Sequence, residues 1–120
     1  MNQKSHELYL QIISKIFLNP KSYDILKEFL DILDKFGFEY EINEGLGLIK
    51  LKGIMNKSII NDFPSIYFNQ DKGKKIHIIH MGNYIEIQIF INKKRTPIKI
   101  YIPKSWKIEY ENSYLYIFFN

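Results

Sequence analysis

Residues 75–91, KIHIIHMGNYIEIQIFI, contain two runs of alternating apolar residues separated by Gly82 and Asn83. A Gly-Asn pair in this position is typical of a β-hairpin with a two-residue turn, because both residues tolerate the positive φ of the primed turns. Such a turn also sets the register of the two strands. In that register His77 faces Gln88 and Ile79 faces Glu86.

The predicted register divides the side chains of this hairpin between two faces. One face is almost all isoleucine and is expected in the core: Ile76, Ile78, His80, Ile85, Ile87, Ile89 and Ile91. The other face mixes apolar, aromatic and polar side chains: His77, Ile79, Met81, Tyr84, Glu86, Gln88 and Phe90. A binding site on the hairpin is therefore expected on the mixed face.

The chain has 120 residues and no cysteine, which predicts a single domain over residues 1–120 without disulfides or cysteine-bound metal. No apolar run reaches membrane-spanning length, and residues 1–11 lack a signal-peptide pattern. We therefore expect a soluble, cytoplasmic protein with no membrane partner. The absence of Ala and Val beside many Ile, Lys and Asn indicates an AT-rich genome, so the positions of residues carry more information than their numbers.

The remaining periodicity predicts an α+β fold. Apolar residues recur at helical spacing over residues 5–18 and again over residues 20–36, where Pro20 begins the second helix and Gly37 ends it. Alternating patterns then continue from about residue 38 to residue 119. We predict two amphipathic helices packed on one face of a twisted antiparallel meander of about six to eight strands. Residues 55–62 fit a short helix or a loop.

The last two strands are predicted at residues 106–110 and 114–119, joined by a turn at Asn112 and Ser113. The final strand is apolar on both faces, so it is expected either in the middle of a sheet or at an edge that a second subunit covers. A homodimer through the C-terminal strand is one consequence of the second alternative.

Positive charge is concentrated in the second half of the chain. Residues 1–62 hold eight lysines against nine acidic residues, whereas residues 63–120 hold nine basic residues against four acidic ones. Because the hairpin reverses at Gly82, its two ends lie together, and six cations are predicted to share one rim: Lys72, Lys74, Lys75, Lys93, Lys94 and Arg95. Such a rim suits the phosphates of an anionic partner, although lysines in hairpin loops also serve solubility.

The mixed sheet face is the second predicted binding surface. Its candidate residues combine aromatic rings with cations and polar groups: His77, Tyr84, Glu86, Gln88, Lys99, Tyr101 and Tyr116. This combination is typical of a stacking platform for single-stranded nucleic acid or of a protein-binding patch. Packing under the helices is the alternative for the same stripe.

Metal binding and catalysis have weaker support in the sequence. His77 and His80 fall on opposite faces of one strand, so they do not share a metal ion. His77 lies near Glu86 and could act as a general base, yet no nucleophile motif accompanies it. We expect no cofactor, no metal and no catalytic residues.

These observations favour a small non-enzymatic binding protein whose basic rim contacts nucleic acid or a nucleic-acid-bound complex. The alternative is a protein-interaction module, either an inhibitor or a homodimeric adaptor, that uses the aromatic face and the C-terminal strand.

Overall fold

A computed structural model of the chain describes residues 20–43, 45–71, 73–91 and 96–119. Within these residues one helix, α2 (Pro20–Lys35), precedes nine antiparallel strands in two sheets. The four-stranded sheet has the order β1-β2-β9-β8 and consists of β1 (Glu41–Asn43), β2 (Leu48–Lys52), β9 (Tyr114–Phe118) and β8 (Lys107–Glu111). The five-stranded sheet follows chain order with β3 (Ile54–Ile60), β4 (Phe63–Asp71), β5 (Lys74–His80), β6 (Tyr84–Ile91) and β7 (Ile98–Pro103).

The central hairpin is confirmed as β5 and β6, with the predicted register. His77 pairs with Gln88, and Ile79 pairs with Glu86. The amide of Met81 donates to the carbonyl of Tyr84 at 2.9 Å, which closes the turn. Of the two central turn residues, only Gly82 has a positive φ (97°), as a type II′ turn requires.

The core lies between the isoleucine face of the five-stranded sheet, the inner face of the four-stranded sheet and α2. Leu26, Phe29, Leu30 and Leu33 of α2 are fully buried in the same cluster as Ile76, Ile78 and Ile87. The helix ends as predicted at Gly37, where φ is 76°. The amide of Phe38 donates to the carbonyl of Leu33 and that of Gly37 to Asp34, which is the Schellman pattern.

Three details of the predicted architecture are corrected. The described residues form nine strands, where about six to eight were predicted. The strands form two sheets instead of one meander, because β9 inserts between β2 and β8 and leaves β3–β7 as a separate sheet. Residues 55–62 are neither helix nor loop but most of β3 and its turn, with φ of 49° at Asn61 and 68° at Asp62. The described residues contain one helix, and the other predicted helix, over residues 5–18, lies outside them.

The last hairpin is confirmed, and its final strand is internal. β9 pairs with β2 on one side and with β8 on the other. Leu115 and Ile117 are fully buried, which explains why the sequence is apolar here. Because both edges of β9 already have partners, its main chain offers no open edge to a second subunit.

Gly53 is the point at which the chain passes from the four-stranded to the five-stranded sheet. A Cβ atom at this position would lie 2.5 Å from the carbonyl oxygen of Asn69 and 2.5 Å from the ring of Phe68. Its amide donates to the carbonyl of Ser113 at 2.9 Å, and its own carbonyl accepts from the Tyr110 hydroxyl at 2.7 Å. Only glycine allows this close approach of two backbones.

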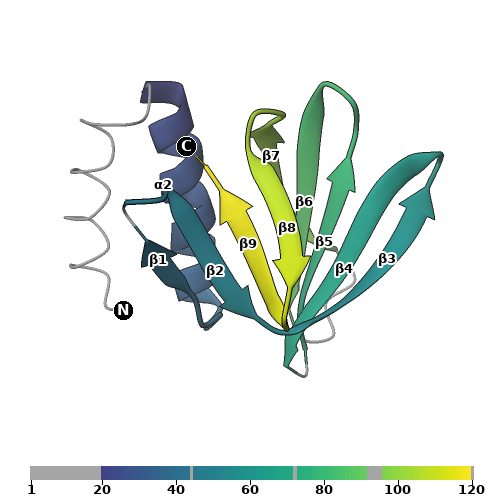
Figure 1. Ribbon diagram of the computed structural model, residues 1–120, viewed down its shortest axis with the longest axis horizontal. Helices are drawn as coiled ribbons and strands as arrows, with labels where there is room; N and C mark the ends of the chain where they lie inside the picture. Colours follow the sequence, from purple (N-terminus) through teal and green to yellow (C-terminus); the bar gives the residue numbers. More distant parts are fainter. Residues whose placement is uncertain (1–19, 44, 72, 92–95, 120) are drawn as a thin grey trace.

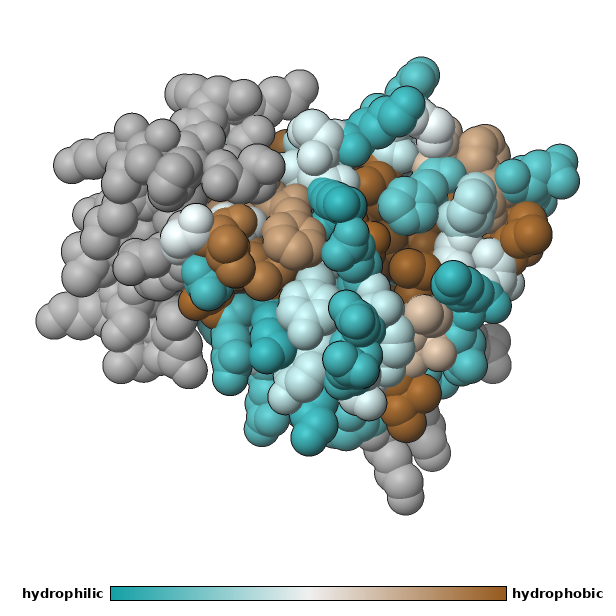
Figure 2. Space-filling model, in the orientation of Figure 1, coloured by the Kyte–Doolittle hydropathy of each residue, from teal (hydrophilic) through white to brown (hydrophobic). Residues whose placement is uncertain are grey.

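The strands of both sheets converge near this passage and fan apart from it (Figure 1). Within the described residues, β3 and β8 are edge strands of their sheets, so each is paired on one side only. Apolar side chains gather on the surface between these two strands (Figure 2). In the described part of the chain, no helix has the length and apolarity needed to cross a membrane.

We predict that Gly53→Ala destabilises the fold by about 2 kcal/mol or more, because the added methyl group overpacks against a backbone carbonyl and a buried ring. Urea unfolding measures this change. Gly45→Ala is the matched control, since its added Cβ would meet only the Asn43 side chain at 3.5 Å. Equal unfolding midpoints for the two variants would contradict the role assigned to Gly53.

Candidate functional site

The face of the five-stranded sheet that points away from α2 is open to solvent, and we call it the outer face. It carries the mixed side of the predicted hairpin together with residues of β4 and β7, because Tyr67 pairs with His77 and Tyr101 pairs with Glu86. Tyr67, Tyr84 and Tyr101 expose 38%, 38% and 54% of their surface. The helix therefore packs on the isoleucine face and leaves the aromatic face free.

One end of the outer face contains a hollow of about 410 Å³, lined by Asn56, Tyr67, Asn69, Lys75 and Phe90. These residues come from four adjacent strands, β3 to β6, and the pairings of Asn56 with Tyr67 and of Lys75 with Phe90 bring them together. The hollow thus joins two aromatic rings, two side-chain amides and one exposed ammonium group. From here on this hollow is the outer hollow.

The centre of the outer face is a stacked pair of rings. The rings of Tyr67 and His77 lie 3.8 Å apart at an angle of 10°. His77 is only 3% exposed, and burial lowers the pKa of its imidazole, against the opposing effects of a hydrogen bond with Gln88 and the charge of Glu86. The His77 ring therefore lies beneath the Tyr67 ring and is itself almost inaccessible to solvent.

The other predicted residues of this face also lie on it. The rings of Tyr84 and Tyr101 meet edge to face, with centroids 5.4 Å apart. The Gln88 side-chain amide donates to Glu86 at 2.6 Å, and the exposed Lys99 pairs across the ladder with Gln88. The carboxylate of Glu86 is thus partly engaged within the face.

Tyr116 is the exception among the predicted face residues. It lies on β9 in the four-stranded sheet, so it belongs to a different surface from Tyr84 and Tyr101. The ammonium group of Lys50 lies 6.0 Å from its ring centroid and 4.1 Å from that of Tyr114. The aromatic residues of the two sheets do not form one platform, because the chain passes from the five-stranded to the four-stranded sheet at residues 104–106.

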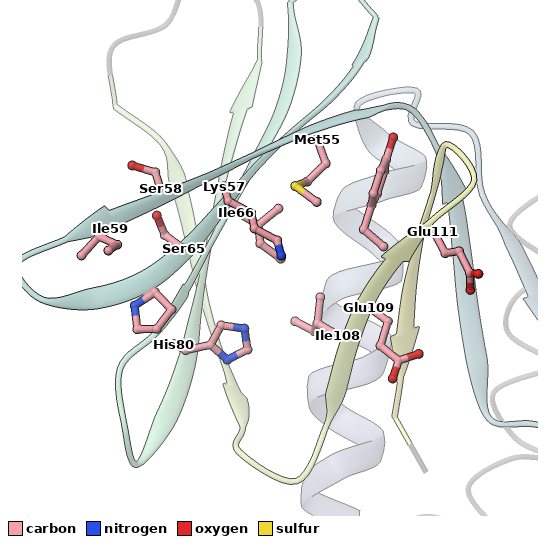
Figure 3. Close-up of a pocket in the computed structure, with 12 residues that line it drawn as sticks. Met55, Lys57, Ser58, Ile59, Ser65, Ile66, His80, Ile108, Glu109 and Glu111 are labelled. Atoms are coloured by element: carbon pink, nitrogen blue, oxygen red, sulfur yellow. The ribbon is translucent and has the colours of Figure 1, made fainter.

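A groove lies between β3 and β8 on the opposite side of the five-stranded sheet (Figure 3). Its volume is about 1030 Å³. The apolar part of its lining includes Met55, Ile66, Ile108 and Tyr110, and the polar part includes Lys57, His80, Glu109 and Glu111. We call it the β3–β8 groove. Sequence reasoning missed it, since β3 had not been recognised as a strand.

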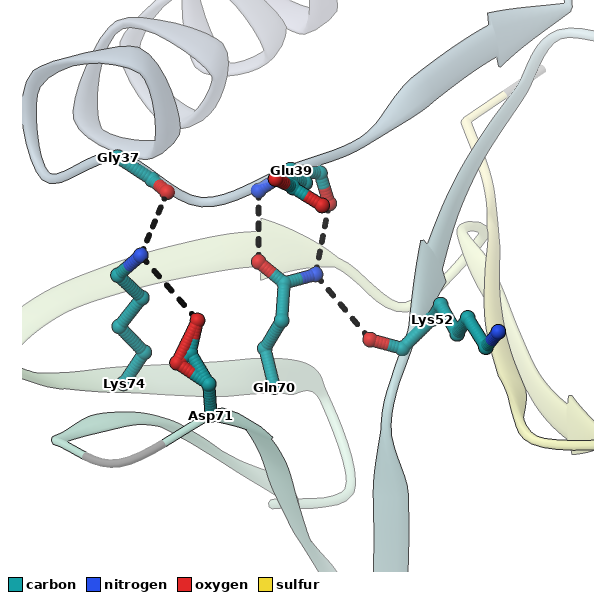
Figure 4. A network of polar contacts seen from close by, with 6 residues as sticks. All are labelled: Gly37, Glu39, Lys52, Gln70, Asp71 and Lys74. Atoms are coloured by element: carbon teal, nitrogen blue, oxygen red, sulfur yellow. Dashed lines mark hydrogen bonds and ion pairs between the residues drawn. The ribbon is translucent and has the colours of Figure 1, made fainter.

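The basic rim is brought together in part. The pairing of Lys74 with Ile91 places the start of β5 beside the end of β6, as predicted. The ammonium group of Lys74, however, donates to the carbonyl of Gly37 at 2.9 Å and lies 3.4 Å from Asp71 (Figure 4). Lys74 therefore stabilises the carbonyl end of α2, where a cation is favoured, and Lys75 is exposed. Lys72, Lys93, Lys94 and Arg95 lie outside the described residues.

Next to Lys74, a bulge in β4 directs Gln70 toward the other sheet (Figure 4). The side-chain amide of Gln70 accepts from the amide of Glu39 at 2.6 Å and donates to its carbonyl at 2.7 Å. It also donates to the carbonyl of Lys52 at 3.2 Å. The Gln70 side chain therefore ties β4 to the end of β2 and to the segment that precedes β1.

His77 and His80 lie on opposite faces, as predicted: His77 stacks on the outer face, and His80 lines the β3–β8 groove. Within the described ranges, His, Asp and Glu residues form no cluster of three or more suited to a metal ion. Comparison of the chain with protein-family models, curated proteins and solved structures found no match.

We predict that His77 makes the fold less stable as the pH falls. Its pKa is lowered in the folded state, so the unfolded chain takes up the proton first, and stability is lost as the pH falls below about 6.5. Urea unfolding of the wild type and of His77→Phe between pH 7.5 and 5.5 should show a steeper loss in the wild type. His6 and His80 are present in both proteins and cancel in the difference. Parallel pH profiles would contradict the prediction.

Proposed function

We propose that this protein is a non-enzymatic binding protein whose outer face contacts single-stranded nucleic acid, alone or within a nucleic-acid-bound complex. The observation that carries the proposal is the outer hollow. It holds an aromatic ring on β4 and another on β6, with Lys75 between them on β5. Bases stack on aromatic rings regardless of sequence, and lysines neutralise the phosphates that connect the bases.

The polar residues of the hollow fit the same partner. Asn56 and Asn69 each offer an amide donor and an acceptor, which match the edges of an unpaired base. The exposed ring of Tyr101 and the ammonium group of Lys99 extend the surface along the sheet. Arg95 is the only arginine of the chain, so bidentate reading of bases is limited and weak sequence preference is expected.

The rim lysines would add charge to one end of this surface. Lys75 lies at the start of β5, and residues 93–95 follow the end of β6, with which β5 pairs. A nucleic-acid strand whose bases occupy the outer hollow would place its phosphates near the end of the sheet where β5 begins and β6 ends. Affinity would then depend strongly on salt.

We predict that Lys75→Gln weakens binding of a fluorescein-labelled oligo(dT) by about two- to fivefold, because one exposed ion pair is lost. It should also lower the slope of log affinity against log salt by about 0.7, which corresponds to one phosphate contact. Fluorescence anisotropy at several KCl concentrations measures both. Lys57→Gln is the control, since it removes the same charge from the β3–β8 groove. If both variants lose affinity equally, the outer hollow is not the binding site.

We also predict that Phe90→Leu weakens oligo(dT) binding by about fivefold or more, because it retains an apolar side chain and removes the stacking surface. Phe118→Leu makes the same change in the four-stranded sheet and should leave binding unchanged.

A salt-insensitive dimer in light scattering, with no affinity for oligo(dT), would instead favour the protein-interaction alternative.

A further inference from the structure

The proposed function does not use the β3–β8 groove. Its volume of about 1030 Å³ reaches the upper end of the about 300–1,000 Å³ typical of small-molecule sites. It opens where the core cluster ends, so its floor continues the packed interior: Ile66, Ile108 and Tyr110 are half-buried and contact that cluster. At one wall, Ile59 exposes 73% of its surface. The surface that lines the groove is therefore mostly apolar, as in small-molecule sites.

The polar side chains of the groove are divided by charge. Lys57 and His80 point their nitrogen atoms into the groove (Figure 3). Glu109 and Glu111 lie on the other side of β8 and point away from it. The Glu109 carboxylate is held by the ammonium group of Lys107 at 2.9 Å. The interior of the groove therefore offers nitrogen donors over an apolar floor, and its acidic groups face outward.

The register explains this division. Lys57 pairs with Ile66, so its side chain shares the isoleucine face of the sheet, one residue away from Asn56 on the outer face. His80 pairs with Ile85 on the same isoleucine face. A lysine and a histidine placed at the border of an apolar floor can bind an anionic group whose remaining part is apolar.

We propose that the β3–β8 groove binds an amphipathic anion, namely a long-chain carboxylate of the fatty-acid type. The carboxylate accepts hydrogen bonds from Lys57 and His80, and the hydrocarbon chain lies on Ile66, Ile108 and Met55. Charge complementarity selects the anion, since Lys57 and His80 point nitrogen donors into the groove, whereas the carboxylates of Glu109 and Glu111, although they belong to its lining, point away (Figure 3). The site is separate from the outer hollow, because the two lie on opposite faces of the same sheet.

Displacement of the fluorescent probe dansylundecanoate from the purified, delipidated full chain tests this proposal. Laurate and dodecanol share one hydrocarbon chain and differ in the charged group. We expect one laurate per chain, bound about tenfold more tightly than dodecanol, as one charge-assisted hydrogen bond would produce. Lys57→Gln should remove this preference and keep the affinity for dodecanol. Because Lys57 is exposed, its replacement leaves the fold intact.

Two further variants separate the groove from general charge effects. Glu109→Gln and Lys75→Gln should bind laurate at least as tightly as the wild type, since neither side chain points into the groove. Ile108→Glu should abolish binding of both laurate and dodecanol, and urea unfolding checks that this variant still folds. Equal affinity for laurate and dodecanol in the wild type, or an unchanged preference in Lys57→Gln, would overturn the proposal. A dimer that binds neither laurate nor dodecanol and protects the β3 amides from hydrogen exchange would also overturn the proposal, because the groove would then hold a strand of a second chain.

Discussion

The close approach of the backbone at Gly53 to β4 is the constraint on which the rest of the structure depends. At this residue the chain leaves β2 and enters β3, against the ring of Phe68 and the carbonyl of Asn69. The hydrogen bonds to Ser113 and Tyr110 fix the same residue to the β8–β9 hairpin. Because β3 begins and β8 ends at one anchored point and the two strands diverge from it, a groove opens between them, and the outer face of the five-stranded sheet remains uncovered (Figure 1).

The elements that could be predicted from the sequence are those specified by neighbouring residues. The β5–β6 hairpin needs only a Gly-Asn turn between two alternating runs, and the end of α2 needs only Gly37 followed by an apolar residue. The β8–β9 hairpin is similar, since Asn112 and Ser113 adopt the positive φ of a tight turn. The hairpin register therefore also predicts the correct face for the aromatic residues of β6, and Tyr101 of β7 lies on the same face.

The parts that could not be predicted depend on distant pairings or on two-sided burial. β2 pairs with β9 across more than half the chain, so nothing local separates the strands into two sheets or moves Tyr116 away from Tyr101. The sequence of β3, IMNKSII, does not alternate cleanly, because both of its faces contribute to surface hollows. Its turn residues, Asn61 and Asp62, were the available signal for a hairpin of β3 and β4, which together carry three of the five residues that line the outer hollow.

β3 links the two candidate surfaces, because successive residues of one strand point to opposite faces. Asn56 contributes to the outer hollow, and Lys57 contributes to the β3–β8 groove. A slip of one residue in the pairing with β4 would exchange these two side chains between the surfaces. As an edge strand, β3 has only β4 to hold it in register, so the register is set at its two ends, by Gly53 and by the turn at Asn61. The glycine that opens the groove therefore also decides which side chain of β3 faces each surface.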